Sequence, residues 1–171
     1  MKVIFLDFDG VINNFNRDLL VDFDNVKYIL DIVNATGSKI VATTSNKYSF
    51  QKNNGAGIGY YRYVNLLKEH GVEILDVTPL VDLNRELEII AYLKMHPEVS
   101  EFLILDDDYV IESLKEHQVF LDLYRGICEE HVIPSVKILS GNLGFYPPDF
   151  NFDETLNERV ERINKYYSRK K

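Results

Sequence analysis

Short apolar runs alternate with longer amphipathic stretches along the chain. Strands are predicted near residues 2–7, 39–44, 72–75 and 101–106, with a weaker candidate at 118–122. Between these runs, apolar residues recur at helical spacing, which predicts helices near 22–35, 60–70, 85–95, 109–116, 129–139 and 153–167. Strands that alternate with helices are typical of a parallel sheet with helices on both faces, so we expect an α/β fold.

The first apolar run ends in acidic residues. Residues 3–6 have the continuous apolar character of a strand buried on both faces, and Asp7, Asp9 and Gly10 follow them. Carboxylates two residues apart point to one side of a strand, and burying them is costly unless they bind something. Ligands of open α/β sheets lie at the carboxyl ends of the strands. We therefore expect a site here; the alternative is an acidic turn that caps a helix.

Two later apolar runs also end in polar residues. The run 39–42 leads into hydroxyl residues at 43–45, which suit either anion binding or a polar turn with a helix N-cap. The run 101–105 leads into three adjacent acids at 106–108, which repel one another unless a cation is present. Carboxylate oxygens are the ligands that hard divalent cations prefer, so these acids form either a metal site or a solvated acidic loop.

Two basic side chains are candidates for binding an anion near these acids. Arg85 stands at the start of the predicted helix 85–95, and a surface ion pair is the alternative reading of it. Lys47, two residues after Ser45, is the rival cation. The two are not interchangeable, because arginine makes bidentate contacts that lysine cannot make.

The order of these motifs resembles that of the haloacid dehalogenase (HAD) superfamily of phosphotransferases. Residues 7–11 match its first motif, Asp-x-Asp-Gly-Val, in full. Thr44 falls at the hydroxyl of the second motif, with Thr43 and Ser45 as neighbours that could be mistaken for it. Arg85 stands for the basic residue of the third motif, and the acids at 106–108 stand for the fourth.

The resemblance implies a Mg²⁺-dependent phosphomonoester hydrolase that acts through an aspartyl-phosphate. Asp7 would attack phosphorus, and Asp9 would protonate the leaving oxygen and then activate water. The residues that would bind the phosphate are Thr44, Ser45, Lys47 and Arg85. The residues that would hold Mg²⁺ are Asp7, the backbone carbonyl of Asp9, Asp106 and Asp107.

A closer resemblance is to the compact HAD-type domain grouped with RNA-repair proteins, which also occurs as standalone phage and bacterial chains. It rests on residues 85–99, 106–108, 126–132 and 138–141, and it extends to about residue 144. It implies a Rossmann-like three-layer sandwich without a sizeable cap domain, and a phosphorylated small molecule, nucleotide or nucleic-acid terminus as substrate. The subgroup often has Ser-Ser-Trp-Arg where this chain has Thr-Ser-Asn-Lys at 44–47.

Two other functions remain to be weighed. A receiver-type signalling domain would place its phosphoacceptor aspartate on the third strand, ahead of the Thr or Ser and the Lys, so the order of motifs here argues against it. A non-catalytic phosphate- or protein-binding module on a HAD scaffold is the second alternative. The intact Asp7 and Asp9 weaken that alternative.

Composition fits one domain over residues 1–171, with a core to about 144 and a terminal helix at about 153–167. No apolar stretch approaches the ~20 residues of a membrane helix, so we expect no membrane partner. A net charge of −8 argues against a broad nucleic-acid-binding surface, although it is compatible with a nucleic-acid end as substrate. The single cysteine, Cys128, permits no internal disulfide, which predicts a cytoplasmic protein.

Overall fold

The fold is built on a central parallel sheet. The computed structural model describes residues 1–52, 58–108 and 113–143. The five strands of the sheet are β1 (Lys2–Leu6), β2 (Lys39–Ala42), β3 (Ile74–Val77), β4 (Glu101–Asp106) and β5 (Gln118–Phe120). Every pairing is parallel and the order is β3-β2-β1-β4-β5, which confirms the α/β prediction. β1 lies in the middle, so the acids that follow it lie at the centre of one sheet edge.

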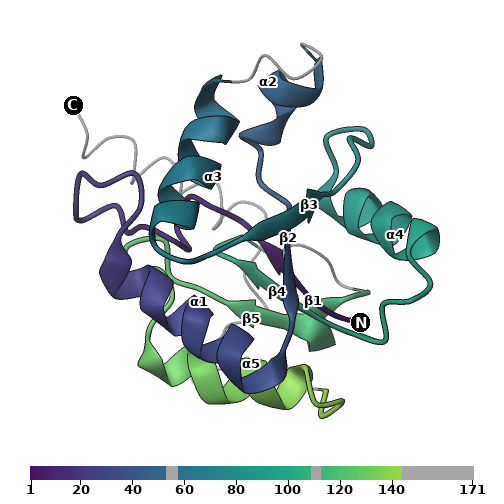
Figure 1. Cartoon of the computed structure of the whole chain (residues 1–171). Coiled ribbons are helices and arrows are strands. Elements are labelled where there is room, and N and C mark those ends of the chain that lie inside the picture. Colours follow the sequence, from purple (N-terminus) through teal and green to yellow (C-terminus); the bar gives the residue numbers. More distant parts are fainter. Residues whose placement is uncertain (53–57, 109–112, 144–171) are drawn as a thin grey trace, which may run out of the picture.

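Helices cover both faces of this sheet (Figure 1). The α-helices of the described residues are α1 (Phe23–Thr36), α2 (Lys47–Lys52), α3 (Ile58–Glu69), α4 (Arg85–Met95) and α5 (Val132–Ile138). Two 3₁₀ turns, η1 (Lys115–His117) and η2 (Glu129–His131), complete the described elements. Among the residues that the structure describes, no helix is both long and apolar enough to cross a membrane.

The two faces of β1 belong to two separate apolar clusters. Ile4 and Leu6 pack with residues of α1, α3 and α5, whereas Val3 and Phe5 pack with α4. This split follows from the strand period of two, which sends successive side chains to opposite faces. Residues 3–6 are continuously apolar because both faces of β1 are covered, as predicted. The fold is a three-layer sandwich.

Several element boundaries differ from the prediction. The third strand lies two residues later than expected, because Gly71 ends α3 with φ +83° and Val72 N–H then donates to Leu67 O at 2.9 Å. This helix-ending turn occupies the residues expected to open the strand. The short helix α2 was not predicted.

The C-terminal half was predicted less well. The helix expected at 129–139 divides into η2 and α5, and the one expected at 109–116 lies partly outside the described residues. The helix expected at 153–167 lies wholly outside them. Within α5, Pro134 has no N–H, so it is tolerated only in the first turn, close to the point where α5 begins.

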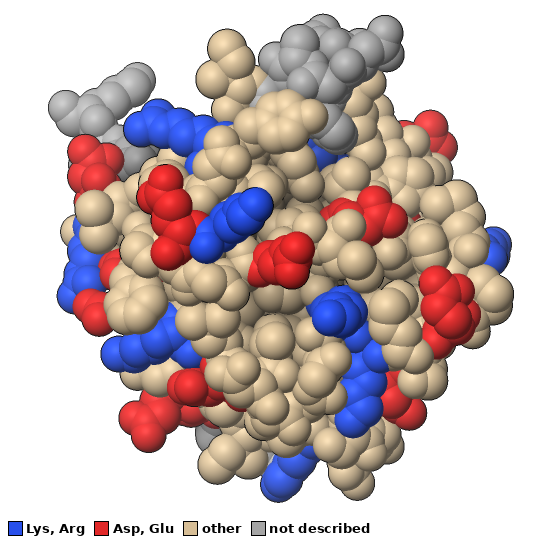
Figure 2. All heavy atoms as spheres, in the orientation of Figure 1, with Lys and Arg blue, Asp and Glu red and all other residues tan. Residues whose placement is uncertain are grey.

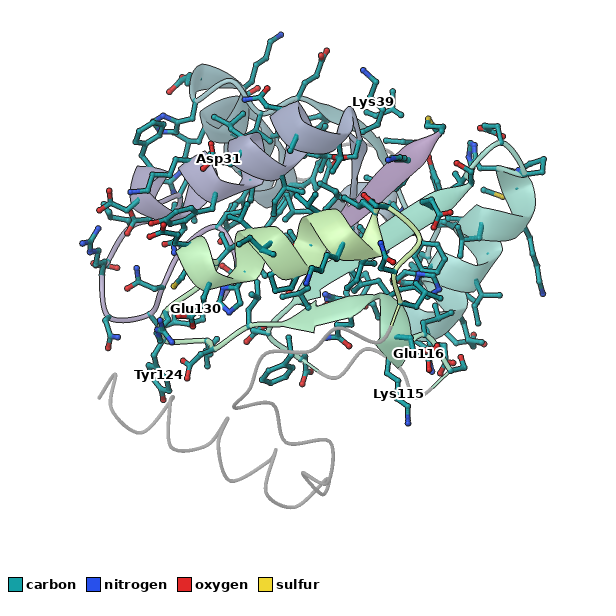
Figure 3. The ribbon with its side chains drawn as sticks, turned by 90° about the horizontal axis from the view of Figure 1, so that it is seen from below. Asp31, Lys39, Lys115, Glu116, Tyr124 and Glu130 are labelled. Carbon is teal, nitrogen blue, oxygen red and sulfur yellow. The ribbon has the colours of Figure 1, made fainter. Side chains whose placement is uncertain are left out.

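The carboxyl ends of the strands share one edge of the sheet. In Figure 3, Lys39 opens β2 and Lys115 precedes β5, and both lie on one side of the sheet. Tyr124 and Glu130 follow β5 and lie on the other side. All strands are parallel, so the residues that follow β1, β2 and β4 gather on the side of Tyr124. This is the edge where ligands of open α/β sheets bind.

Candidate active site

Three acids meet at the carboxyl edge of β1 and β4. Leu6 pairs with Leu105, and Asp7 N–H donates to Leu105 O at 3.0 Å, so Asp7 and Asp106 end neighbouring strands side by side. One carboxylate oxygen each from Asp7, Asp106 and Asp107 lies within 4.8 Å of the others. Oxygens on opposite sides of a Mg²⁺ ion lie about 4 Å apart, so these three acids fit a small divalent cation after minor adjustment.

Asp106 is the most buried of the three acids. Its side chain is fully buried, and burial raises its pKa to about 7. Arg85 opposes this shift of the pKa, whereas the neighbouring charges of Asp7 and Asp108 add to it. The Asp108 N–H donates to Asp106 Oδ1 at 2.9 Å. A buried carboxylate that meets two like charges is a strained group, and a cation would relieve that strain.

Arg85 supplies a positive charge to the cluster from the first residue of α4. Asn84 caps this helix, and its side-chain oxygen accepts from Leu87 N–H at 3.1 Å. Arg85 Nη1 lies 3.1 Å from Asp7 Oδ2 and also donates to Asp106 Oδ2. The cap therefore sets the start of α4 so that one guanidinium bridges the acids of two strands.

Gly10 makes room for the third acid. Its φ of +76° favours glycine, and a Cβ at this position would lie 2.6 Å from Asp107 Cγ. The sequence indicated only a sharp turn at Gly10. In the structure the missing side chain also allows the loop after β1 to approach the loop after β4.

Asp9 is held by side chains that sequence reasoning did not assign to the site. Tyr63 Oη donates to Asp9 Oδ1 at 2.6 Å, and Asn13 Nδ2 donates to the same oxygen at 3.2 Å. Asn46 Nδ2 donates to Asp9 Oδ2 at 3.0 Å. The Asp9 carboxylate is not one of the three clustered acids.

The hydroxyl residues after β2 have different environments. Thr44 is buried, and its Oγ1 accepts from the backbone and side-chain N–H groups of Asn46, both at 3.3 Å. Thr43 is also buried, and its Oγ1 has no hydrogen-bond partner among the described residues. Ser45 is exposed. They follow β2 directly beside the end of β1, because Thr43 N–H donates to Leu6 O at 2.9 Å.

Lys47 makes its direct contacts outside the acidic cluster, although the charges of Asp7 and Arg85 still act on its ammonium. Its ammonium is 2.6 Å from Glu88 Oε2 and also donates to Thr78 Oγ1, and the side chains of Lys47 and Glu88 are both fully buried. The structure thus brings Arg85, and not Lys47, to the carboxylates. The other oxygen of Glu88, Oε1, has no partner among the described residues.

The overlooked residues carried weak signals in the sequence. Asn46 stands where the related subgroup often has tryptophan, and Asn13 follows the first motif closely. Tyr63 belongs to an aromatic cluster, Tyr60, Tyr61 and Tyr63, in which packing was expected for at least two members. Tyr60 and Tyr63 are indeed buried, whereas Tyr61 is 44% exposed.

One comparison with known proteins gives a match. A sequence model of the HAD domain in Swiss Army Knife RNA repair proteins matches residues 3–132. This range contains every residue expected at the site, including Asp7, Thr44, Arg85 and Asp106. No curated protein and no solved structure matches the chain.

Proposed function

Because this chain belongs to the family of HAD domains found in Swiss Army Knife RNA repair proteins, we propose that it is a Mg²⁺-dependent phosphomonoester hydrolase. The proposed reaction passes through an aspartyl-phosphate. The observation that carries the proposal is the cluster of Asp7, Asp106 and Asp107 at the carboxyl edge of the sheet, with Arg85 bridging two of its members. The family supports the reaction class, and the cluster supports the site.

Asp7 is the proposed nucleophile. Its carboxylate oxygen would form a bond to phosphorus as the bond between phosphorus and the leaving oxygen breaks. Asp9 would give its proton to that leaving oxygen, and would then take a proton from the water that attacks phosphorus in the second step. The products are an alcohol and inorganic phosphate, and both aspartates return to their starting state.

Charge at the reacting centre would be managed by a metal ion and by Arg85. Mg²⁺, held by Asp7, Asp106, Asp107 and the Asp9 carbonyl, would screen the repulsion between the carboxylate nucleophile and the phosphate. Arg85 would stabilise the negative charge on the phosphoryl oxygens, because its guanidinium already lies against the nucleophile.

The loop after β2 would bind the phosphoryl group. Thr44 and Ser45 are the proposed donors, with the backbone N–H groups beside them. We assign the phosphate-binding charge to Arg85 and not to Lys47, since the Lys47 ammonium is fully buried against Glu88.

The proposed substrate is a nucleotide or a nucleic-acid end. The occurrence of the family in RNA repair proteins supports this class. Figure 2 shows acidic and basic side chains interspersed over one face of the molecule, without a continuous basic stripe on that face. Binding of a chain end in the site fits this distribution better than electrostatic binding of a long strand.

Hydrolysis of an aryl phosphate by the wild type and by Asp7→Asn tests the proposal. The wild type should be active with Mg²⁺ and inactive after chelation, and Asp7→Asn should abolish turnover while the fold stays intact. Asp31→Asn is the matched control, because Asp31 is exposed on α1 (Figure 3) and is not one of the three clustered acids. Equal rates for Asp7→Asn and wild type would remove Asp7 as nucleophile.

A substrate panel addresses the alternative function. It would contain nucleotides, sugar phosphates and oligonucleotides with a 3′- or 5′-phosphate, and the terminal phosphates of the oligonucleotides should be removed fastest. Phosphate binding without turnover of any member would instead support a non-catalytic module on this scaffold.

A further inference from the structure

Asp9 is anchored unevenly through its two carboxylate oxygens. Among the described residues, Oδ1 accepts from Tyr63 and Asn13, whereas Oδ2 accepts only from Asn46. Each carboxylate oxygen has about two lone-pair sites. Oδ1 is therefore saturated, and Oδ2 keeps one site open.

From this asymmetry we infer that Tyr63 is a positioning residue, which anchors Oδ1 of Asp9 so that Oδ2 is the oxygen that exchanges the proton. The inference rests on the proposed function, in which Asp9 is the general acid and base. In the first step the proton on Oδ2 goes to the leaving oxygen. In the second step the water proton returns to Oδ2. Tyr63 keeps its own proton throughout.

Packing fixes the Tyr63 hydroxyl in place. The centroid of the Tyr63 ring lies 5.1 Å from that of Phe8. Phe8 stands between Asp7 and Asp9 in the sequence, and its side chain is fully buried. Tyr63 is only 6% exposed. The Tyr63 hydroxyl therefore donates to Asp9 Oδ1 from a buried and fixed position.

Asn46 ties the other oxygen to the proposed phosphate-binding loop. Its Nδ2 donates to Asp9 Oδ2 at 3.0 Å and to Thr44 Oγ1 at 3.3 Å. One amide therefore spans the loops after β1 and β2. Tyr63 anchors Oδ1, and Asn46 links Oδ2 to Thr44. The Asp9 carboxylate therefore keeps one orientation relative to the phosphoryl group. Such preorganisation is what general acid–base catalysis requires.

Tyr63→Phe, compared with the control Tyr60→Phe, tests this role in the full-length protein. Tyr60 lies on the same helix and its ring stacks on Phe8 with 6.1 Å between the ring centroids, but the charges that act on its hydroxyl are those of Asp76 and Tyr61 and not that of Asp9. For an alkyl phosphate, whose leaving oxygen needs a proton, Tyr63→Phe should lower kcat about tenfold, the scale of one hydrogen bond to a charged group. KM should not change, and the burst of phosphoenzyme formed from an aryl phosphate should change little. Tyr60→Phe should match the wild type in each measurement.

The same comparison in an Asp9→Asn background separates positioning from a structural effect. A residue that acts through Asp9 should add little to the loss already caused by Asp9→Asn. A phosphoenzyme burst from the aryl phosphate that slows as much as kcat for the alkyl phosphate, or full additivity with Asp9→Asn, would overturn the inference. If the wild type is active but Tyr63→Phe is indistinguishable from Tyr60→Phe, the inference is overturned while the proposed function stands. A wild type inactive toward every phosphate would refute the proposed function and the inference with it.

Discussion

The buried ion pair between Lys47 and Glu88 gives the sharpest test of how this site is held together. Both side chains are fully buried, and the Lys47 ammonium lies 2.6 Å from Glu88 Oε2. Burial lowers the pKa of Lys47, whereas Glu88 acts in the opposite direction. The pair joins the start of α2 to α4, one turn beyond Arg85 on the same helix. Its loss should therefore affect stability and the placement of Arg85 together.

The expected magnitude follows from the burial of both charges. At an effective dielectric constant near 20, two unit charges at this distance attract each other by about 6 kcal/mol, which roughly offsets the cost of burying them. Lys47→Met leaves the Glu88 carboxyl buried without a cation, and Glu88→Leu leaves Lys47 without an anion. Each single variant should lose about 3–5 kcal/mol of unfolding free energy, whereas the double variant should be close to the wild type.

Denaturant unfolding of the wild type, both single variants and the double variant measures this cycle. Arg125→Met is the control, because the Arg125–Glu130 pair has a similar distance, 2.9 Å, but both side chains are about half exposed. The control should lose less than about 1 kcal/mol. The reasoning is refuted if Lys47→Met costs no more than Arg125→Met, or if the double variant loses the sum of the two single losses.

Three further predictions concern the acids and the turn between them. Asp9→Asn should slow hydrolysis of the covalent intermediate by ~10²–10⁴-fold and trap phosphoenzyme in rapid-quench experiments. An equal loss of rate for substrates with good and poor leaving groups, with no trapped phosphoenzyme, would contradict this role of Asp9. Mg²⁺ should raise the melting temperature of the wild type but hardly that of Asp106→Ala, and identical responses in thermal melts would place the metal elsewhere. Gly10→Ala should destabilise the fold by more than Gly37→Ala, which costs about 1 kcal/mol. Both glycines have a positive φ, but a Cβ on Gly10 would clash with Asp107, whereas a Cβ on Gly37 would meet nothing within 4 Å. Equal losses in denaturant unfolding would show that the loops after β1 and β4 do not approach closely at Gly10.

The pattern of apolar runs was sufficient to predict the sheet and the acidic edge. β1 and β4 are continuous apolar runs because both faces of each strand are covered, and this signal is local in the chain. Connections through helices make neighbouring strands parallel, so their carboxyl ends share an edge. Asp7 and Asp106 could therefore be expected to meet, although 99 positions separate them in the sequence.

The partners of the individual side chains could not be predicted in the same way. Tyr63 contacts Asp9 across 54 positions, and Lys47 contacts Glu88 across 41 positions. Each contact depends on how a helix is rotated and packed on the sheet, which local periodicity does not specify. Lys47 was for this reason a fair candidate for phosphate binding from its sequence position. The folded chain instead buries its ammonium beneath α4, because a buried charge needs an opposite charge within hydrogen-bonding distance, and Glu88 is the group that packing brings there.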